Sequence, residues 1–165
     1  MITSPVRAFV GLGGNVGDVE TTLMEAMWSM DSLPQTSIRA QSRLYRSPPW
    51  GRGDQPEFLN AVVELQTRLA ATILLEALLD IEVRFGRVRA SGDRWGPRKL
   101  DLDLLAYGEE VIDVPGMHLP HPRLHERGFV LVPLAEIAST LEIPGRGKVA
   151  DLLAAADVSG IVAVD

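Results

Sequence analysis

Hydrophobic and polar residues follow two different periods along this chain, and the changes of period delimit the predicted elements. Alternating or short continuous apolar runs predict four strands, over residues 7–12, 37–45, 58–69 and 100–107. Apolar residues at helical spacing predict two helices, over residues 18–31 and 72–85, and Asp18 is placed to cap the first. The order of these six elements is therefore β-α-β-β-α-β.

This order is typical of an α+β fold of the ferredoxin-like type, in which an antiparallel sheet carries two helices on one face. Further elements follow this core: a short strand at 111–112, a helix over 126–138 that Pro133 should kink or restart, and a helix over 149–156. Two long loops, residues 47–57 and 87–97, interrupt the core, and such loops are usually functional or disordered. We expect one domain over residues 1–165.

Composition narrows the range of functions. The net charge is −6 and the pI about 5.1, so bulk charge gives no support to a nucleic-acid partner. The absence of cysteine excludes disulfides and thiolate metal sites. No apolar stretch approaches membrane-spanning length, and the N-terminus lacks the pattern of a signal peptide. We therefore expect a cytoplasmic protein that contacts no membrane.

Two aspartates share one face of the predicted strand over 100–107. Leucines alternate there with Asp101 and Asp103, so the carboxylates point the same way, about 6.5–7 Å apart at Cα. Like charges so placed repel each other. Two interpretations are open: a ladder of salt bridges to nearby arginines, or a divalent cation such as Mg²⁺, which favours one or two carboxylates together with substrate phosphates.

The loop before that strand is strongly basic. The loop and the two residues after it carry five cations within 13 residues, namely Arg87, Arg89, Arg94, Arg98 and Lys99. These cations could be solvated counterions of the aspartates. Arginine, however, suits bidentate phosphate contacts better than lysine does. The neighbouring aspartates and arginines together favour a Mg-nucleotide site.

The glycine-rich segment GLGGNVGD, residues 11–18, does not fit a known phosphate loop. Val16 stands where the dinucleotide fingerprint needs its third glycine, and no Gly-Lys-Ser/Thr follows. We expect a tight strand-to-helix turn that uses positive φ, in preference to direct phosphate binding. The histidines at 118, 121 and 125 have no zinc-site spacing and are interrupted by prolines.

Four aromatic residues lie at junctions between loops and elements: Trp50, Phe58, Trp95 and Phe129. Ordinary packing explains each one taken singly. Asn60 nevertheless shares a strand face with Phe58, and a flat heteroaromatic ligand would be held by stacking rings with an amide at its edge.

Four blocks of the sequence, in order, resemble the 6-hydroxymethyl-7,8-dihydropterin pyrophosphokinase family of folate biosynthesis. They read GLGGNVGD; YRSPPWG followed by DQPEFLNAVVEL; GRVR with RWGPRKLDLDLL; and LPHPRLHERGFVLVPL. The resemblance covers about residues 6–138. It implies transfer of pyrophosphate from ATP to the hydroxymethyl group of a reduced pterin, with release of AMP, on a ferredoxin-like core with mobile loops.

The resemblance also implies a role for particular residues. Asp101 and Asp103 would hold two Mg²⁺ ions with ATP, and Arg87 and Arg98 would meet the phosphates in catalysis. Further nucleotide contacts would come from Glu82, Arg89, Arg94, His121 and Arg127. The pterin pocket would comprise Ser47, Pro48, Trp50, Phe58, Asn60 and Phe129, with Trp95 closing the site. The partners would be ATP and the pterin, and we expect a monomer.

Two other classes of protein share the predicted fold. An RNA-binding module would need an aromatic strand motif and a basic sheet face, which this sequence lacks. A non-catalytic small-molecule-binding domain would have no use for paired aspartates beside an arginine loop. Release of AMP from ATP that depends on a reduced pterin would distinguish the enzyme from both.

Overall fold

A computed structural model describes residues 4–49, 56–86 and 99–164. The ferredoxin-like core comprises β1 (Val6–Gly14), α1 (Val19–Asp31), β2 (Thr36–Gln41), β3 (Leu44–Ser47), β4 (Phe58–Thr67), α2 (Ala71–Arg84) and β5 (Asp101–Tyr107). The later elements are β6 (Ile112–Val114), β7 (Met117–Leu119), a 3-10 turn η1 (Leu124–Glu126), α3 (Gly128–Ala138), β8 (Glu142–Ile143), β9 (Gly147–Lys148), α4 (Val149–Ala154) and β10 (Val162–Val164).

The main sheet has the order β10-β3-β4-β1-β5, with β2 also paired to β4, and every one of its pairings is antiparallel. The chain order of the core is the predicted β-α-β-β-α-β, so the α+β, ferredoxin-like prediction is confirmed. Long stretches of β1 pair with β4 on one side and β5 on the other. These three strands therefore form the centre of the sheet and one of its edges.

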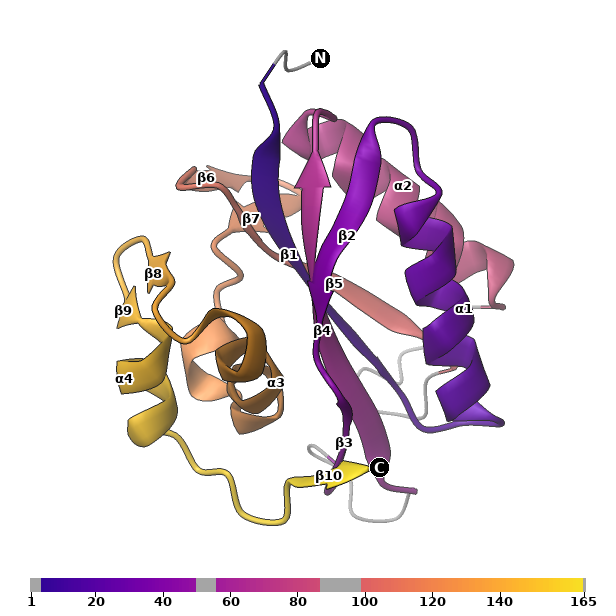
Figure 1. Ribbon diagram of the computed structural model, residues 1–165, viewed down its shortest axis with the longest axis vertical. Coiled ribbons are helices and arrows are strands. Elements are labelled where there is room, and N and C mark those ends of the chain that lie inside the picture. Colours follow the sequence, from indigo (N-terminus) through magenta and orange to yellow (C-terminus); the bar gives the residue numbers. More distant parts are fainter. Residues whose placement is uncertain (1–3, 50–55, 87–98, 165) are drawn as a thin grey trace.

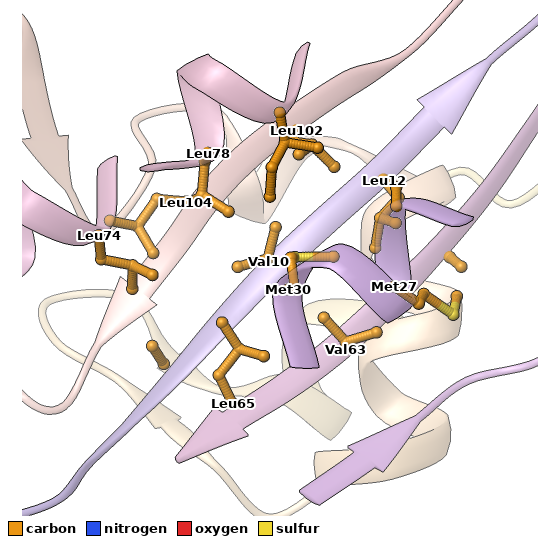
Figure 2. Packing of buried hydrophobic residues seen from close by; sticks show 14 of the residues in the cluster. Val10, Leu12, Met27, Met30, Val63, Leu65, Leu74, Leu78, Leu102 and Leu104 are labelled. Carbon is orange, nitrogen blue, oxygen red and sulfur yellow. The ribbon is translucent and has the colours of Figure 1, made fainter. Parts of the chain in front are cut away.

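The two faces of the sheet are covered differently (Figure 1). Helices α1 and α2 pack on one face, over a core that includes Val10 and Leu12 of β1, Val63 of β4, and Leu102 and Leu104 of β5 (Figure 2). Helices α3 and α4 pack on the other face, over a smaller cluster. Alternation along β5 thus sends Leu102 and Leu104 under α1 and α2 and puts Asp101 and Asp103 on the opposite face, and this separation of leucines from aspartates was predicted. Leu105, later in the strand, packs in the cluster on the α3 side.

The second predicted strand is in fact two strands, β2 and β3, which share one edge of β4. Ser42 lies in the break. Its N–H donates to the Val62 carbonyl at 2.9 Å, and its hydroxyl accepts from the Val62 N–H at 3.0 Å and donates to the Arg43 carbonyl at 2.7 Å. The Ser42 hydroxyl thus takes the place of one backbone acceptor in the sheet. The edge formed by β2 and β3 can bend at this point, because the Val62 N–H keeps a hydrogen-bond partner.

The glycine-rich segment forms the end of a strand rather than a turn alone. We predicted that β1 ends at residue 12 and that positive φ explains the glycines, but the strand continues to Gly14, and within this segment only Gly17 has positive φ. Close approach explains two of the others. A Cβ on Gly13 would lie 2.7 Å from the Asn60 side-chain oxygen, and one on Gly14 would lie 2.6 Å from the Lys99 carbonyl.

Asp18 caps α1, as predicted, by accepting from the Thr21 N–H. Helix α3 is continuous through Pro133. The stretch from residue 117 to 125 contains β7 and the start of η1, and neither these elements nor β8, β9 and β10 were predicted from the sequence. Within the described ranges, no helix has the length and apolar character needed to cross a membrane.

Candidate functional site

Strand register places the candidate residues of the pterin and metal sites in one row across the sheet. Asn60 of β4 pairs with Gly13 of β1, and Gly13 pairs with Asp101 of β5. Residues paired in this way face the same side. Neighbouring strands lie about 4.8 Å apart, so Asn60 and Asp101 are separated by about 10 Å across a glycine that has no side chain. The row therefore places an amide and a carboxylate on one face of the sheet, on either side of a glycine.

A second row repeats this pattern next to the first. Val62, Gly11 and Asp103 are paired across the same three strands. Two carboxylates therefore stand together at the edge of the sheet, beside two glycines of β1 over which the Asn60 amide and the Leu105 side chain lie. In the parts of the chain that the structure describes, no cluster of three or more His, Cys, Asp or Glu side chains is arranged to hold a metal. Two carboxylates fit Mg²⁺ that completes its shell with water and phosphate oxygens, but they do not fit a zinc site.

Arg127 provides a positive charge opposite this edge. Its side chain is 14% exposed, and its Nη1 lies 3.8 Å from Oδ2 of Asp103, which is 43% exposed. Burial lowers the pKa of Arg127 from its ordinary value, while Asp103 acts in the opposite direction. The Nε of Arg127 is buried without a hydrogen-bond partner among the described residues. A buried guanidinium with an unmet donor is suited to an anionic ligand.

His121 enters the same region as a neutral ring. Its backbone N–H donates to the Leu105 carbonyl at 2.8 Å, which ties it to β5, and its Nδ1 accepts from the Arg123 N–H at 3.1 Å. Burial, followed by the positive charges of Arg127 and Arg123, lowers the pKa of His121 to about 4. Since Nδ1 is an acceptor, the ring proton resides on Nε2. His121 is therefore a neutral hydrogen-bond donor at pH 7.

Glu82 lies near the C-terminal end of α2 and is only 1% exposed. Its Oε2 accepts from the backbone N–H of Leu102 at 2.7 Å. Leu102 lies between the two aspartates on the edge strand, so this bond anchors the segment that carries them. The nucleotide contact that the sequence suggested for Glu82 stays a prediction, whereas its attachment to β5 is a feature of the fold.

The candidate pterin residues that the structure describes lie on or next to β3, β4 and the first turn of α3, three elements that pack against one another. Ser47 is buried, and its hydroxyl accepts from Nδ2 of Asn60 at 2.7 Å. Ser47 also pairs in register with Phe58. Phe129 lies in the first turn of α3, partly buried against the cluster that contains Val62, and its ring lies 5.7 Å from the Arg127 guanidinium carbon.

The C-terminal segment packs against two of these elements. A Cβ on Gly128, the residue before Phe129, would lie 2.2 Å from the Asp157 carbonyl. A Cβ on Gly160 would lie 2.9 Å from Cγ of Pro48. Strand β10 then pairs with β3. Sequence reasoning missed Gly13 and this segment, because both act through contacts between residues far apart in the chain.

The structure thus places ten of the sixteen predicted site residues. Asn60, Asp101 and Asp103 lie on the α3 side of the sheet, whereas Glu82 comes from α2, which packs on the opposite face. The other six lie outside the described residues: Trp50, Arg87, Arg89, Arg94, Trp95 and Arg98. Their roles stay predictions.

Comparison with known proteins identifies the family. Residues 9–139 match the family model of 7,8-dihydro-6-hydroxymethylpterin-pyrophosphokinase (HPPK). The chain is 44% identical over 155 residues to the 2-amino-4-hydroxy-6-hydroxymethyldihydropteridine pyrophosphokinase of Pseudomonas aeruginosa, covering 94% of each protein. It is 46% identical over 159 residues to the enzyme of the same name from Methylorubrum extorquens, covering 96% of this chain and 99% of that protein.

Solved structures agree on the fold. A crystal structure of HPPK-DHPS in complex with substrates matches 91% of this chain with a TM-score of 0.68 at 11% identity, and wild-type Plasmodium falciparum HPPK-DHPS matches 92% with a TM-score of 0.68 at 11% identity. This chain corresponds to 43% and 44% of those longer chains. By its sequence and its fold, the chain belongs to the 7,8-dihydro-6-hydroxymethylpterin pyrophosphokinase family of folate biosynthesis.

Proposed function

We propose that the chain, acting as one catalytic unit, transfers pyrophosphate from Mg-ATP to the hydroxymethyl group of 6-hydroxymethyl-7,8-dihydropterin. The hydroxyl oxygen attacks the β-phosphorus, the bond from that phosphorus to the oxygen bridging to the α-phosphate breaks, and AMP leaves while the hydroxyl proton passes to solvent. The observation that carries this proposal is the pair of rows across β4, β1 and β5, with an amide at one end, carboxylates at the other and glycines between them.

The carboxylate end would hold the metal and the phosphates. Asp101 and Asp103 supply oxygen ligands of the kind that Mg²⁺ prefers, and the bound ions would neutralise the charge of the triphosphate. Arg127, with its buried and unmet Nε, would donate to the nucleotide, and His121 would add a neutral donor. Because a neutral His121 brings no second positive charge next to Arg127, both can lie beside one anionic ligand.

The amide end would hold the pterin. Asn60 is fixed by its bond to Ser47, so its remaining groups have a defined direction. A reduced pterin presents hydrogen-bonding edges and a flat face, and Phe58 and Phe129 would provide the stacking surfaces. The separation of about 10 Å between Asn60 and Asp101 is a suitable span for one bicyclic ring with its hydroxymethyl group directed towards the phosphates.

Positioning and charge neutralisation would account for most of the rate enhancement, as in other phosphoryl transfers. We assign no general base. Arg87 and Arg98 would meet the developing phosphate charge, and Trp50 and Trp95 would complete the pterin pocket, as the family resemblance implies. Glu82 would act in addition through its bond to Leu102, which holds the aspartate segment in place.

The direct test is the product of ATP turnover. Purified protein with Mg-ATP should form AMP only when 6-hydroxymethyl-7,8-dihydropterin is present, in equal amount to the pterin diphosphate, and the reaction should stop when EDTA is added. Formation of ADP would contradict pyrophosphate transfer. Binding of the pterin without consumption of ATP would favour a non-catalytic small-molecule-binding domain.

A further inference from the structure

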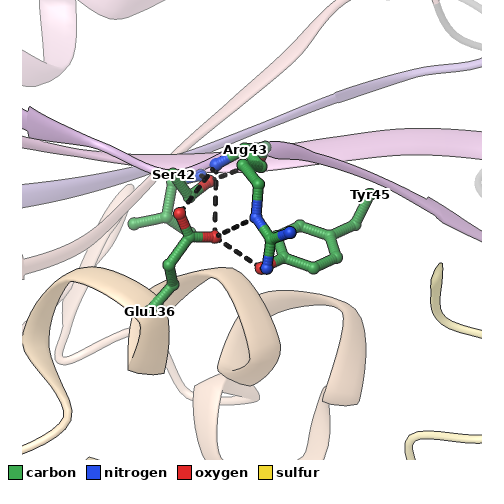
Figure 3. Close-up of polar contacts among 5 residues, drawn as sticks. Ser42, Arg43, Tyr45 and Glu136 are labelled. Atoms are coloured by element: carbon green, nitrogen blue, oxygen red, sulfur yellow. Dashed lines mark hydrogen bonds and ion pairs between the residues drawn. The ribbon is translucent and has the colours of Figure 1, made fainter. Parts of the chain in front are cut away.

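A polar contact between α3 and β3 lies outside the residues considered so far. It comprises Arg43 just before β3, Tyr45 on β3 and Glu136 on α3 (Figure 3). The Tyr45 hydroxyl donates to Oε1 of Glu136, and Nη2 of Arg43 donates to the Tyr45 oxygen at 3.3 Å. The Arg43 backbone N–H lies 3.2 Å from each oxygen of the same carboxylate.

The break between β2 and β3 creates the need for this carboxylate. Ser42 occupies the rung opposite Val62, so the Arg43 N–H is not part of the β4 ladder and requires another acceptor. Glu136 supplies it. Burial, followed by the bond to Glu136, raises the pKa of Tyr45, so the phenol stays protonated and donates. Tyr45 is 5% exposed, so its hydroxyl has few alternatives in solvent.

The same contact is connected to both sides of the candidate pterin pocket. On β3, Tyr45 pairs in register with Asn60, and two residues later Ser47 holds the Asn60 amide. On α3, Glu136 follows Phe129 by seven residues, which is two helical turns, so both lie on nearly the same face, about 10 Å apart along the axis. The buried Leu131 and Leu134 keep the two turns packed on the sheet across Pro133.

We propose that Tyr45 and Glu136 are positioning residues for the pterin site. By fixing α3 against β3, they set the spacing between Phe129 on one side and Asn60 with Phe58 on the other. They would act through these residues and not on the substrates directly, and the carboxylate end of the site lies across the sheet from them, on β5. This inference rests on the proposed pterin pocket, and it assigns a function to two residues that the catalytic scheme does not use.

The test separates pterin binding from nucleotide binding and from stability. Tyr45→Phe keeps the ring and removes the hydroxyl with its two hydrogen bonds, one to Glu136 and one from Arg43. Glu136→Gln keeps the shape and removes the charge. Each should raise the Kd for the reduced pterin by ~3–10-fold, measured by calorimetry with Mg²⁺ and a saturating non-hydrolysable ATP analogue. The Kd for the ATP analogue should stay within twofold of wild type. The Kd of the double variant for the pterin should rise by less than the product of the two single-variant increases, because both substitutions remove the same contact.

A matched control is Glu64→Gln. It breaks the Arg7–Glu64 pair, a 2.9 Å ion pair between β1 and β4 away from the pocket, and should leave pterin affinity unchanged. If Tyr45→Phe and Glu136→Gln lower the melting temperature but bind pterin as Glu64→Gln does, the contact is only structural and the inference is wrong. A wild-type protein that neither binds the pterin nor releases AMP would instead refute the proposed function, so the two failures are distinguishable.

Discussion

Replacing Gly13 by alanine tests whether the close approach of the Asn60 amide to β1 has a function in the site. The added Cβ would lie 2.7 Å from Oδ1 of Asn60, and ordinary contact begins at 3.4 Å, so the amide must retreat by about 0.7 Å. Asn60 is 6% exposed and bound to Ser47 at 2.7 Å, so it has little room to do so without losing that bond. A buried amide left with poor hydrogen bonding costs ~1–3 kcal/mol, which corresponds to a ~5- to 150-fold weaker pterin complex.

Calorimetric titration of the reduced pterin, with Mg²⁺ and a non-hydrolysable ATP analogue present, measures this effect. Gly11→Ala is the matched control, because it adds the same methyl group to the same face of β1, where the nearest atoms belong to Leu105 at 3.6 Å. We expect Gly13→Ala to lose pterin affinity while it keeps its affinity for the nucleotide, and Gly11→Ala to keep both. If a folded Gly13→Ala protein bound the pterin as well as Gly11→Ala does, the role assigned to Asn60 would be wrong.

Three further predictions concern other parts of the site. Phe129→Ala should weaken pterin binding by ~1–3 kcal/mol and change ATP binding little, and calorimetry that gave the reverse order would reverse the pocket assignment. Arg98→Ala should lower kcat by ~100-fold or more, with only partial recovery in Arg98→Lys; a normal kcat with a raised KM for ATP would make Arg98 a simple binding residue. The pKa of His121 is lowered from 6.5 to about 4 in the folded protein. As the pH falls from about 6.5 to about 4, the imidazole is therefore protonated in the unfolded state before it is protonated in the folded state. The free energy of unfolding should fall by ~1–2 kcal/mol over this range because of His121. Urea denaturation of His121→Gln should show a smaller loss over that range, and an equal loss would contradict the buried neutral ring.

Local patterns predicted the parts of the site that depend on local geometry. The alternation of leucine and aspartate over 100–104 fixed which face of β5 carries the carboxylates, because side-chain direction in a strand depends only on the neighbouring residues. The cap at Asp18 is local in the same sense. The roles of individual residues, by contrast, came from resemblance to a family, since spacing alone left the metal and salt-bridge interpretations of the aspartates open.

Features that depend on contacts between distant residues were not predicted. Gly13 approaches Asn60 only once β1 and β4 are paired, and Tyr45 meets a carboxylate 91 residues further along the chain. The break at Ser42 replaces a backbone rung by a side chain and leaves the surrounding hydrophobic pattern nearly unchanged. Such features depend on how the strands and helices pair, so the spacing of apolar residues along the sequence cannot predict them.

The AMP released per folded molecule by Asp101→Asn and Asp103→Asn tests the central claim most directly. If these carboxylates hold Mg²⁺, each variant should lose pterin-dependent AMP release per folded molecule almost completely. Asp101→Asn should also fold at least as well as wild type without metal, because one like charge is removed from the strand face. If they serve mainly to anchor arginines, each variant should melt at a clearly lower temperature with or without metal. In that case, AMP release per folded molecule would be preserved, and the metal assignment would be contradicted.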